Sequence, residues 1–399
     1  MTSISDIVLG NIDSISESYA QSVTEPARII QELSEKLHSD DAKAIYTFDR
    51  MEPISDKSLI AVDGGNAMEQ LTGGDLIVAG ATIGEGLQSK PLFNSAEDFP
   101  SEAFFDFFPH SSNNDKIQKA VRAALELRIL QAIPADYKII DGAYMGNIST
   151  VLFALLDNDP NVSNAILKLN DFDKDGLMMD CIDYLLKPAI ENNINIIAVV
   201  KSDSSKVFTK QFLKGISNSE VVLTDRILAS RVLNPGEFLA PRNIDSNPAL
   251  IAALENRKRP SQNFGDKSLD KAKLHALLTK RAGQLRALRS PEEDRAELGI
   301  LWTTYFKPTA WSQYAKAIKI EFPFRNSMSS EDLISYTRKV VQIVDQDIVE
   351  EGILEPWSQY TADVGAKGVS HAINIVKTHL LATTDDDEAL RSLVRGYRT

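Results

Sequence analysis

The stretch SLIAVDGGNAMEQLTGGDLIVAGATIG, residues 58–84, holds two apolar runs, with one carboxylate and two glycines after the first run. Residues 58–63 and 76–83 are predicted to be strands, because apolar and β-branched side chains dominate both. Asp63 is the last residue of the first predicted strand. A strand end mounts a side chain rigidly, and a following glycine permits close approach of a backbone or a phosphate. The stretch therefore predicts a sheet that presents an acid where a ligand can reach it.

A second strand with the same ending lies at YKIIDGAYMG, residues 137–146, where Asp141 and a glycine follow the apolar run. The run at 194–205 predicts a third buried strand, ending in Lys201. Apolar residues spaced by three and four predict helices around these strands. The other predicted elements are strands at 298–307 and 315–323, helices within 1–50 and at 115–132, 181–191, 329–353 and 370–383, and an irregular Phe-rich segment at 85–113. This order predicts a mixed α/β fold.

The composition is that of an ordinary globular protein, with 399 residues, 43% of them hydrophobic and 25% charged. The single cysteine, Cys181, excludes a disulfide framework and most cysteine-based metal sites, and it fits a reducing cytoplasm. The first residues have neither the basic region nor the apolar core of a signal peptide. No apolar run approaches the length needed to cross a bilayer. The sequence therefore predicts a cytoplasmic protein without a membrane partner.

Charge is distributed unevenly along the chain. The formal net charge is −13, which argues against indiscriminate binding to nucleic acid. Residues 257–289 are nevertheless strongly basic and lie within 240–290, the most plausible insertion or linker. Two interpretations stay open: a solvated helix face, or a surface for phosphates or an acidic partner.

Three carboxylates are candidates for a metal site. Asp63 and Asp141 converge if their strands are neighbours, and Glu126 lies between them in sequence within the apolar context RAALELRIL. A charged side chain is almost never buried without a partner, and converging carboxylates repel one another. A hard divalent cation with oxygen ligands relieves that repulsion, and two such ions can support phosphodiester cleavage. The alternative is that both Asp-Gly pairs are turns and that Glu126 is exposed.

The ordered set IAVDGG, RAALELRIL and YKIIDGAYMG resembles the NurA family, nucleases of DNA end processing. Further pieces occur in the family's order, so the resemblance runs from about residue 58 to residue 380. These pieces are a strand with a lysine at 196–208, a helical segment at 223–238, a late strand pair at 302–323 and a C-terminal helix at 369–380. The family fold resembles ribonuclease H, a mixed sheet surrounded by helices with acids at strand ends.

The resemblance implies roles for particular residues. Asp63, Glu126 and Asp141 match the family's metal-binding acids, and His371 matches a histidine of its C-terminal helix. The implied cofactor is Mn²⁺ or Mg²⁺. The family also has a functional tyrosine in a Tyr-Pro context before that histidine. Here Tyr360 is the nearest tyrosine, and no proline follows it, so the chain departs from the pattern.

Two lysines are candidates for contact with the scissile phosphate. Lys201 and Lys307 both stand at the ends of predicted strands, and a lysine ammonium is a common phosphate partner. An ordinary surface lysine is the alternative for both positions.

The resemblance also implies partners and a domain plan. Residues 1–50 would be an N-terminal helical segment, and 51–399 one nuclease domain with the basic helical insertion at about 240–290. The implied activity is 5′ to 3′ cutting of duplex DNA ends and cutting of single strands, by a homodimer that works with a hexameric HerA-type ATPase. The chain itself has no phosphate-binding Gly-x-x-x-x-Gly-Lys-Ser/Thr loop, so an external motor would be needed. The apolar N-terminal residues are candidates for the dimer or motor contact, or they pack on the protein's own core.

Other functions stay open at this point. The chain could be an adaptor that grips DNA or a partner without cutting, or another ribonuclease H-like hydrolase. The acidic segment 170–183 resembles the start of a calcium loop at Asp171, but Ile182 stands where the loop needs a bidentate glutamate.

Overall fold

The computed structural model describes residues 28–39, 42–155, 157, 159–169, 196–201, 205–212, 223–244, 299–325 and 329–383. The predictions for the first 27 residues, the acidic segment 170–183, the helix at 181–191 and the basic segment 257–289 lie outside the described residues.

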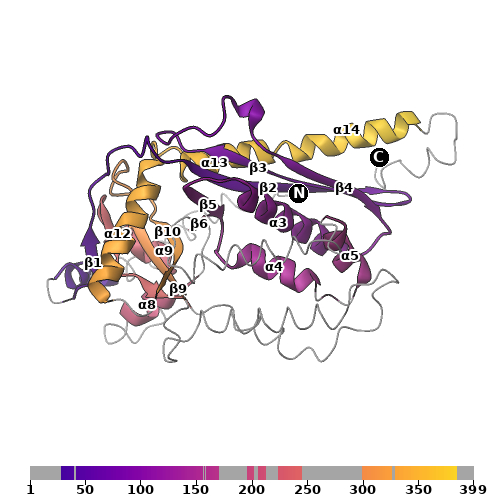
Figure 1. Cartoon of the computed structure of the whole chain (residues 1–399). Coiled ribbons are helices and arrows are strands. Elements are labelled where there is room, and N and C mark those ends of the chain that lie inside the picture. Colours follow the sequence, from indigo (N-terminus) through magenta and orange to yellow (C-terminus); the bar gives the residue numbers. More distant parts are fainter. Residues whose placement is uncertain are drawn as a thin grey trace, which may run out of the picture.

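One mixed sheet organises the described part of the chain (Figure 1). Its strand order is β1-β7-β9-β10-β6-β5-β2-β3-β4, and β8 pairs with β9. The pairs β2–β5 and β5–β6 are parallel, and the other pairs are antiparallel. The strands are β1 (Ile45–Thr47), β2 (Leu59–Leu71), β3 (Gly74–Glu85), β4 (Glu102–Phe108), β5 (Tyr137–Asp141), β6 (Ile196–Val200), β7 (Glu237–Leu239), β8 (Arg242–Asn243), β9 (Gly299–Lys307) and β10 (Ile318–Arg325).

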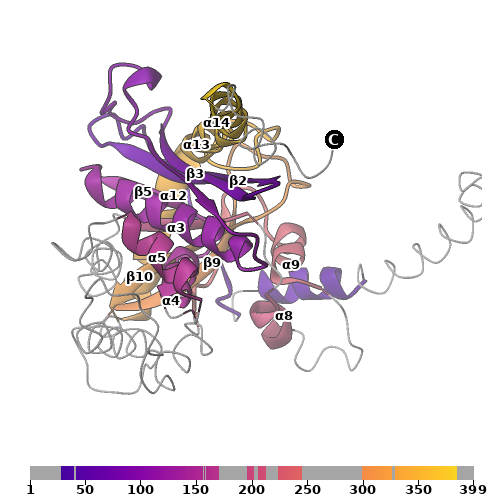
Figure 2. The ribbon, with the colours of Figure 1, turned by 90° about the vertical axis from the view of Figure 1, so that its right-hand side faces the viewer.

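Helices cover both faces of the central strands (Figures 1 and 2). Helices α3, α4 and α5 lie on one side of β2, β3 and β4, and α13 and α14 lie on the other side, over β2 and β3. The described helices are α3 (Asn114–Ala132), α4 (Gly146–Leu155), α5 (Pro160–Lys168), α8 (Val207–Phe212), α9 (Asp225–Val232), α12 (Ser330–Gln346), α13 (Trp357–Ala366), α14 (Val369–Thr383), the 3-10 turn η1 (Ala96–Asp98) and a helix at 28–37.

The alternation of side chains along β2 divides the core into two layers. Ile60 and Val62 pack into the cluster of α3, α4 and α5, whereas Leu59 and Ala61 pack into the cluster of α12. Successive side chains of a strand point to opposite faces, and strands covered on both faces read as continuous apolar runs. This double burial explains why the runs before Asp63 and Asp141 are mostly apolar, with the buried Lys138 as an exception in β5.

The structure corrects the prediction that Asp63 ends a strand. Strand β2 continues through the two glycines to Leu71, and Asp63 pairs with Thr82 in an unbroken antiparallel register. The glycines therefore serve close packing and not a turn. A Cβ atom at Gly65 would lie 2.2 Å from the backbone oxygen of Ala366, so α13 packs directly on the bare backbone at this point.

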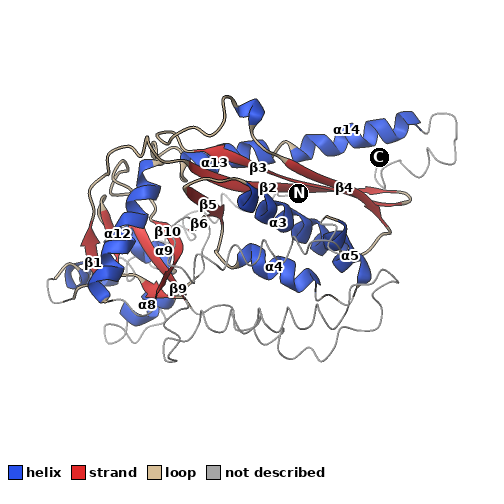
Figure 3. Ribbon diagram, in the orientation of Figure 1, coloured by secondary structure: helices blue, strands red, loops and turns tan. Residues whose placement is uncertain are grey.

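Secondary structure differs from the prediction in two further places (Figure 3). Residues 45–47, expected to be helical, form β1 and pair with β7, because the apolar residues there complete the sheet edge. The segment 85–113, expected to be irregular, contains β4, which pairs with β3 along seven residues. The strands and helices predicted around Asp141, Glu126 and Lys201 are confirmed by β5, α3 and β6.

Candidate active site

Asp63 and Glu126 reach the same point of the sheet from opposite faces. The side chain of Asp63 shares the face of Ala61, on the α12 and α13 side, whereas Glu126 belongs to α3 on the other side. A Cβ atom at Gly64 would lie 2.5 Å from Glu126 Oε1. The Glu126 carboxylate therefore occupies the space above Gly64, next to Asp63 in the chain, and only glycine leaves that space open.

Asp63 is held in an environment that disfavours its charge. Its side chain is only 7% exposed. Burial, and then the charge of Asp141, raise the pKa of Asp63 to about 6. The ammonium of Lys201 acts in the opposite direction, as does the Gly64 backbone N–H, which donates to Asp63 Oδ1 at 2.7 Å. This carboxylate is therefore close to its protonation midpoint near neutral pH.

Glu126 shows the larger effect. It is 5% exposed, and burial raises its pKa to about 8, with a further contribution from the charge of Asp63. Arg122, one turn earlier on α3, opposes this shift with its Nε atom 3.3 Å from Glu126 Oε1. Asn147 of α4 donates a hydrogen bond from Nδ2 to Oε2. These two partners answer the prediction that a buried Glu126 needs polar neighbours.

Asp141 and Lys201 meet because their strands are parallel neighbours. Asp141 is the last residue of β5, and Lys201 follows β6 directly. Lys201 Nζ lies 3.1 Å from Asp141 Oδ2 and 2.6 Å from Glu355 Oε2. Burial opposes the charge of Lys201, but the two carboxylates outweigh burial and raise the pKa of the ammonium above its ordinary value. The predicted partner of a phosphate is thus a permanently charged lysine beside the acids.

Helix α13 closes this site, which the sequence analysis did not foresee. Gln359 donates a hydrogen bond from Nε2 to Asp141 Oδ1, and the charge of Asp363 contributes to the raised pKa of Asp63. Gln359 and Asp363 are four residues apart on α13, a spacing that puts side chains on one helix face, and Glu355 precedes the helix by two residues. Lys367 continues the row, with Nζ 2.6 Å from Asp363 Oδ2. This spacing is visible in EPWSQYTADVGAK and was the available signal.

The donor set fits a hard divalent cation. Asp63, Glu126 and Asp141 offer only carboxylate oxygens, the ligands that Mg²⁺ and Mn²⁺ prefer. Within the described residues, no three His, Cys, Asp or Glu side chains are already gathered as a metal site. The protein's own cations Arg122 and Lys201 contact Glu126 and Asp141 instead. The two buried acids with raised pKa values still identify a place where an added positive charge lowers the free energy.

Among the described residues, His371 makes no hydrogen bond or ion pair with these acids. His371 is an exposed residue of α14, and none of the hydrogen bonds or ion pairs among the described residues joins its side chain to Asp63, Glu126 or Asp141. Its helix does pack on β2 and β3. Tyr360 lies on α13 with 37% of its surface exposed, and its ring packs at 5.8 Å from that of Trp357. The roles implied for His371 and Tyr360 stay predictions.

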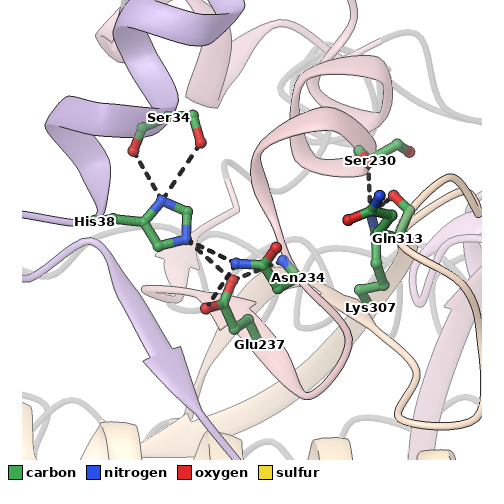
Figure 4. Close-up of polar contacts among 7 residues, drawn as sticks. All are labelled: Ser34, His38, Ser230, Asn234, Glu237, Lys307 and Gln313. Carbon is green, nitrogen blue, oxygen red and sulfur yellow. Dashed lines mark hydrogen bonds and ion pairs between the residues drawn. The ribbon is translucent and has the colours of Figure 1, made fainter.

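Lys307 lies in a different environment from Lys201. Its side chain is fully buried, and Nζ donates to the backbone oxygens of Ser230 and Gln313, each at 2.7 Å (Figure 4). The neighbouring contacts in Figure 4 join the exposed His38 to Glu237 of β7 and to Asn234. A phosphate contact by Lys307 does not fit this position, because its ammonium is enclosed and its donors are engaged in backbone contacts.

Comparison with known proteins places this fold. A family model of the NurA domain matches residues 57–356. The crystal structure of the NurA nuclease from Sulfolobus solfataricus aligns with a TM-score of 0.52 at 12% identity, covering 94% of this chain and 98% of that chain. A crystal structure of NurA gives 0.47 at 9% identity, covering 95% and 99%, and one of NurA with manganese gives 0.44 at 12% identity, covering 91% and 98%. No curated protein matches the chain. Because the family model spans well over half of its residues, this chain belongs to the NurA family.

Proposed function

We propose that this chain is a divalent-metal-dependent DNA nuclease. The observation that carries the proposal is a set of three carboxylates around residues 63–64 of β2: the buried Asp63 and Glu126, on opposite faces of the strand, and Asp141 at the end of the neighbouring strand β5. Buried groups with strongly shifted pKa values cluster at functional sites. In a NurA-family chain, a phosphodiester-cleaving centre is the function that this set of acids supports best.

The proposed fold type is ribonuclease H-like. The inner strands β4, β3, β2, β5 and β6 support it, because the first three are antiparallel and the last three are parallel. Helix α3 lies between β4 and β5 in the chain and carries Glu126. This topology supports the proposal that the acids on β2, α3 and β5 belong to one site.

Asp63, Glu126 and Asp141 would hold one or two Mn²⁺ or Mg²⁺ ions. Such a cation supplies Lewis acidity, which lowers the pKa of a water and offsets charge on the leaving 3′-oxygen. Lys201 would meet a phosphate oxygen, since its ammonium stays charged and lies beside Asp141. His371 is proposed as a further ligand or proton donor. The proposal favours Mn²⁺ over Mg²⁺ because of the family resemblance.

The substrate and partners belong to the same proposal. The nuclease would degrade duplex DNA ends 5′ to 3′ and cut single strands in end resection or defence, as a cytoplasmic homodimer with a HerA-type ATPase. The resemblance supports these partners, together with the absence of an ATP-binding loop from the sequence. The described helices include none that is long and apolar enough to cross a membrane.

The decisive experiment measures cutting of labelled linear duplex and single-stranded DNA with Mn²⁺ and with EDTA. Asp141→Asn preserves side-chain volume and removes one charge, so cutting should fall at least about 100-fold. Asp136→Asn is the matched control, because Asp136 precedes the same strand and accepts hydrogen bonds from Ser58 at the opposite end. Equal cutting by wild type and both Asp141→Asn and Asp63→Ala would refute the assignment.

A non-cutting adaptor is the second candidate. It is favoured by the exposed His371, which makes no hydrogen bond or ion pair with the acids among the described residues, and by the missing Tyr-Pro context. Calorimetric titration with Mn²⁺ separates the two candidates. A nuclease should bind the ion and lose affinity in Glu126→Gln, whereas an adaptor should show no difference between these proteins. Comparing nucleoside monophosphates with DNA as substrates separates another ribonuclease H-like hydrolase.

A further inference from the structure

Gln359 is a buried polar residue that the family resemblance does not explain. Its side chain is 0% exposed, although it stands on α13 between the half-exposed residues Tyr360 and Trp357. Its Nε2 donates a hydrogen bond to Asp141 Oδ1. The other oxygen of that carboxylate contacts Lys201. Both oxygens of Asp141 are therefore fixed, one by an amide and one by an ammonium.

The oxygen of the same amide has no hydrogen-bond partner among the described residues. Gln359 Oε1 is buried and accepts no hydrogen bond from any described residue. The amide orientation is set by Asp141, because a flipped amide would bring an oxygen against the carboxylate. A buried acceptor without a partner costs about 1–3 kcal/mol. Because this acceptor belongs to the amide that contacts Asp141, it is available to a group bound beside that carboxylate.

Helix α13 holds Gln359 rigidly against the acids. Asp347 is fully buried and accepts hydrogen bonds from Ser358 N at 2.9 Å and from Leu87 N at 3.0 Å, which fixes the start of the helix. The end of the helix packs on the bare backbone of Gly65. Because both ends are held, the backbone of Gln359 is fixed beside Asp141.

We propose that Gln359 is a positioning residue of the metal centre: its N–H fixes the carboxylate of Asp141, and its unpartnered Oε1 supplies an oxygen acceptor beside the cation. The proposal rests on the proposed metal-dependent function and adds a residue to it. Outer-shell hydrogen bonds orient metal-ligating carboxylates, and their removal typically costs about 10–100-fold in metal affinity or activity.

The test compares Gln359→Met with Gln346→Met. Gln346 of α12 is a matched control, because it is also buried, accepts one hydrogen bond, from Ile54 N at 3.1 Å, and has an amide nitrogen without a partner among the described residues. Mn²⁺ affinity is measured by calorimetry, and the melting temperature is measured in EDTA. Gln359→Met should weaken Mn²⁺ binding about 10–100-fold, whereas Gln346→Met should bind Mn²⁺ like wild type.

Each outcome separates this inference from the proposed function. If Gln359→Met and Gln346→Met lose similar melting temperature and both keep wild-type Mn²⁺ affinity, Gln359 is structural and the inference is overturned. If wild type binds no Mn²⁺ at all, the proposed function fails, and the inference fails with it. Should Gln359→Met not fold, Gln359→Asn keeps an amide that is too short to reach Asp141, and it should show the same loss of Mn²⁺ affinity.

Discussion

Lys201 and Lys307 stand in equivalent places in the sequence and in opposite environments in the structure. Both end apolar strands, β6 and β9. Lys201 contacts the carboxylates of Asp141 and Glu355, which raise its pKa, whereas Lys307 contacts two backbone oxygens, and burial lowers its pKa to about 8. One lysine is charged at any physiological pH, and the other is close to losing its charge.

The difference lies in the two halves of the sheet. The half containing β2, β5 and β6 has parallel strands, so Asp141 and Lys201 emerge at the same end of neighbouring strands. The half containing β9 and β10 is antiparallel, and Lys307 points into a core that includes α9. Parallel neighbours bring strand ends together at one side, where α/β proteins usually bind their ligands. A strand-end lysine is therefore informative only when the direction of the neighbouring strand is known.

The sharpest way to break this comparison is to replace each lysine by methionine. Lys201→Met should lower DNA cleavage about 100-fold, because an electrostatic partner of the reacting phosphate is lost. Its Mn²⁺ affinity should not fall, because Asp141 no longer shares its charge with an ammonium. Lys307→Met should cut DNA at a rate within about threefold of wild type. Comparable losses of cleavage in the two variants would remove the distinction between the two halves.

The sequence predicts the half of the sheet with β2, β5 and β6 better than the half with β9 and β10, for a physical reason. Strands buried on both faces leave a continuous apolar run, and such runs place Asp141 and Lys201 correctly. The sequence cannot tell Lys201 from Lys307, because burial depends on which strands pair. The sequence also gives no sign that Gln359 is buried at the site, since a polar residue on a helix usually faces solvent. Only the packing of α13 against β2 shows that this residue is enclosed.

The two glycines after Asp63 give a second comparison. A Cβ atom at Gly64 would meet the side-chain atoms Glu126 Oε1 at 2.5 Å and Arg122 Cγ at 2.7 Å, whereas at Gly65 it would meet a backbone oxygen at 2.2 Å. A side chain moves aside more easily than a packed helix backbone does. Gly64→Ala should therefore lower cleavage about tenfold by displacing Glu126, with a modest loss of stability.

Gly65→Ala should lower stability more and cleavage less than Gly64→Ala does, because the backbone of α13 has to shift. Overpacking of this kind costs about 1–3 kcal/mol or more. Urea unfolding and the cleavage rate of both variants check this pair of expectations. A Gly64→Ala protein that cuts normally would mean that Glu126 has room elsewhere and that Gly64 does not define the site.

The carboxylates around β2 should also make the stability of the protein depend on pH. The folded-state pKa of Glu126 is about 8, above the ordinary value of 4.5, so the folded state binds this proton more tightly than the unfolded chain. Its contribution to stability is present below about pH 4.5 and is lost as the pH rises through 8. In EDTA, Glu126→Gln should therefore be less dependent on pH than wild type and more stable than wild type at about pH 8.5. Urea unfolding at several pH values measures this, and a wild type that gains stability over the same range relative to Glu126→Gln would contradict it.

The smallest effect of pH on stability is expected for Lys307. Its contribution rises with pH, whereas that of Glu126 falls, and it changes over a higher pH range. Its folded-state pKa is about 8, below the ordinary value of 10.5, so the unfolded chain binds this proton more tightly. The stability that Lys307 contributes therefore rises as the pH increases from about 8 to 10.5. The difference in unfolding free energy between wild type and Lys307→Met should increase by about 1–3 kcal/mol across that window, at about 1.4 kcal/mol for each pKa unit.

Lys138→Met is a second probe, because burial lowers the pKa of Lys138 to about 8 as well. A difference that stays constant with pH for Lys307 alone would mean that its two carbonyl contacts keep it charged, and the contrast with Lys201 would then concern access to the phosphate and not charge.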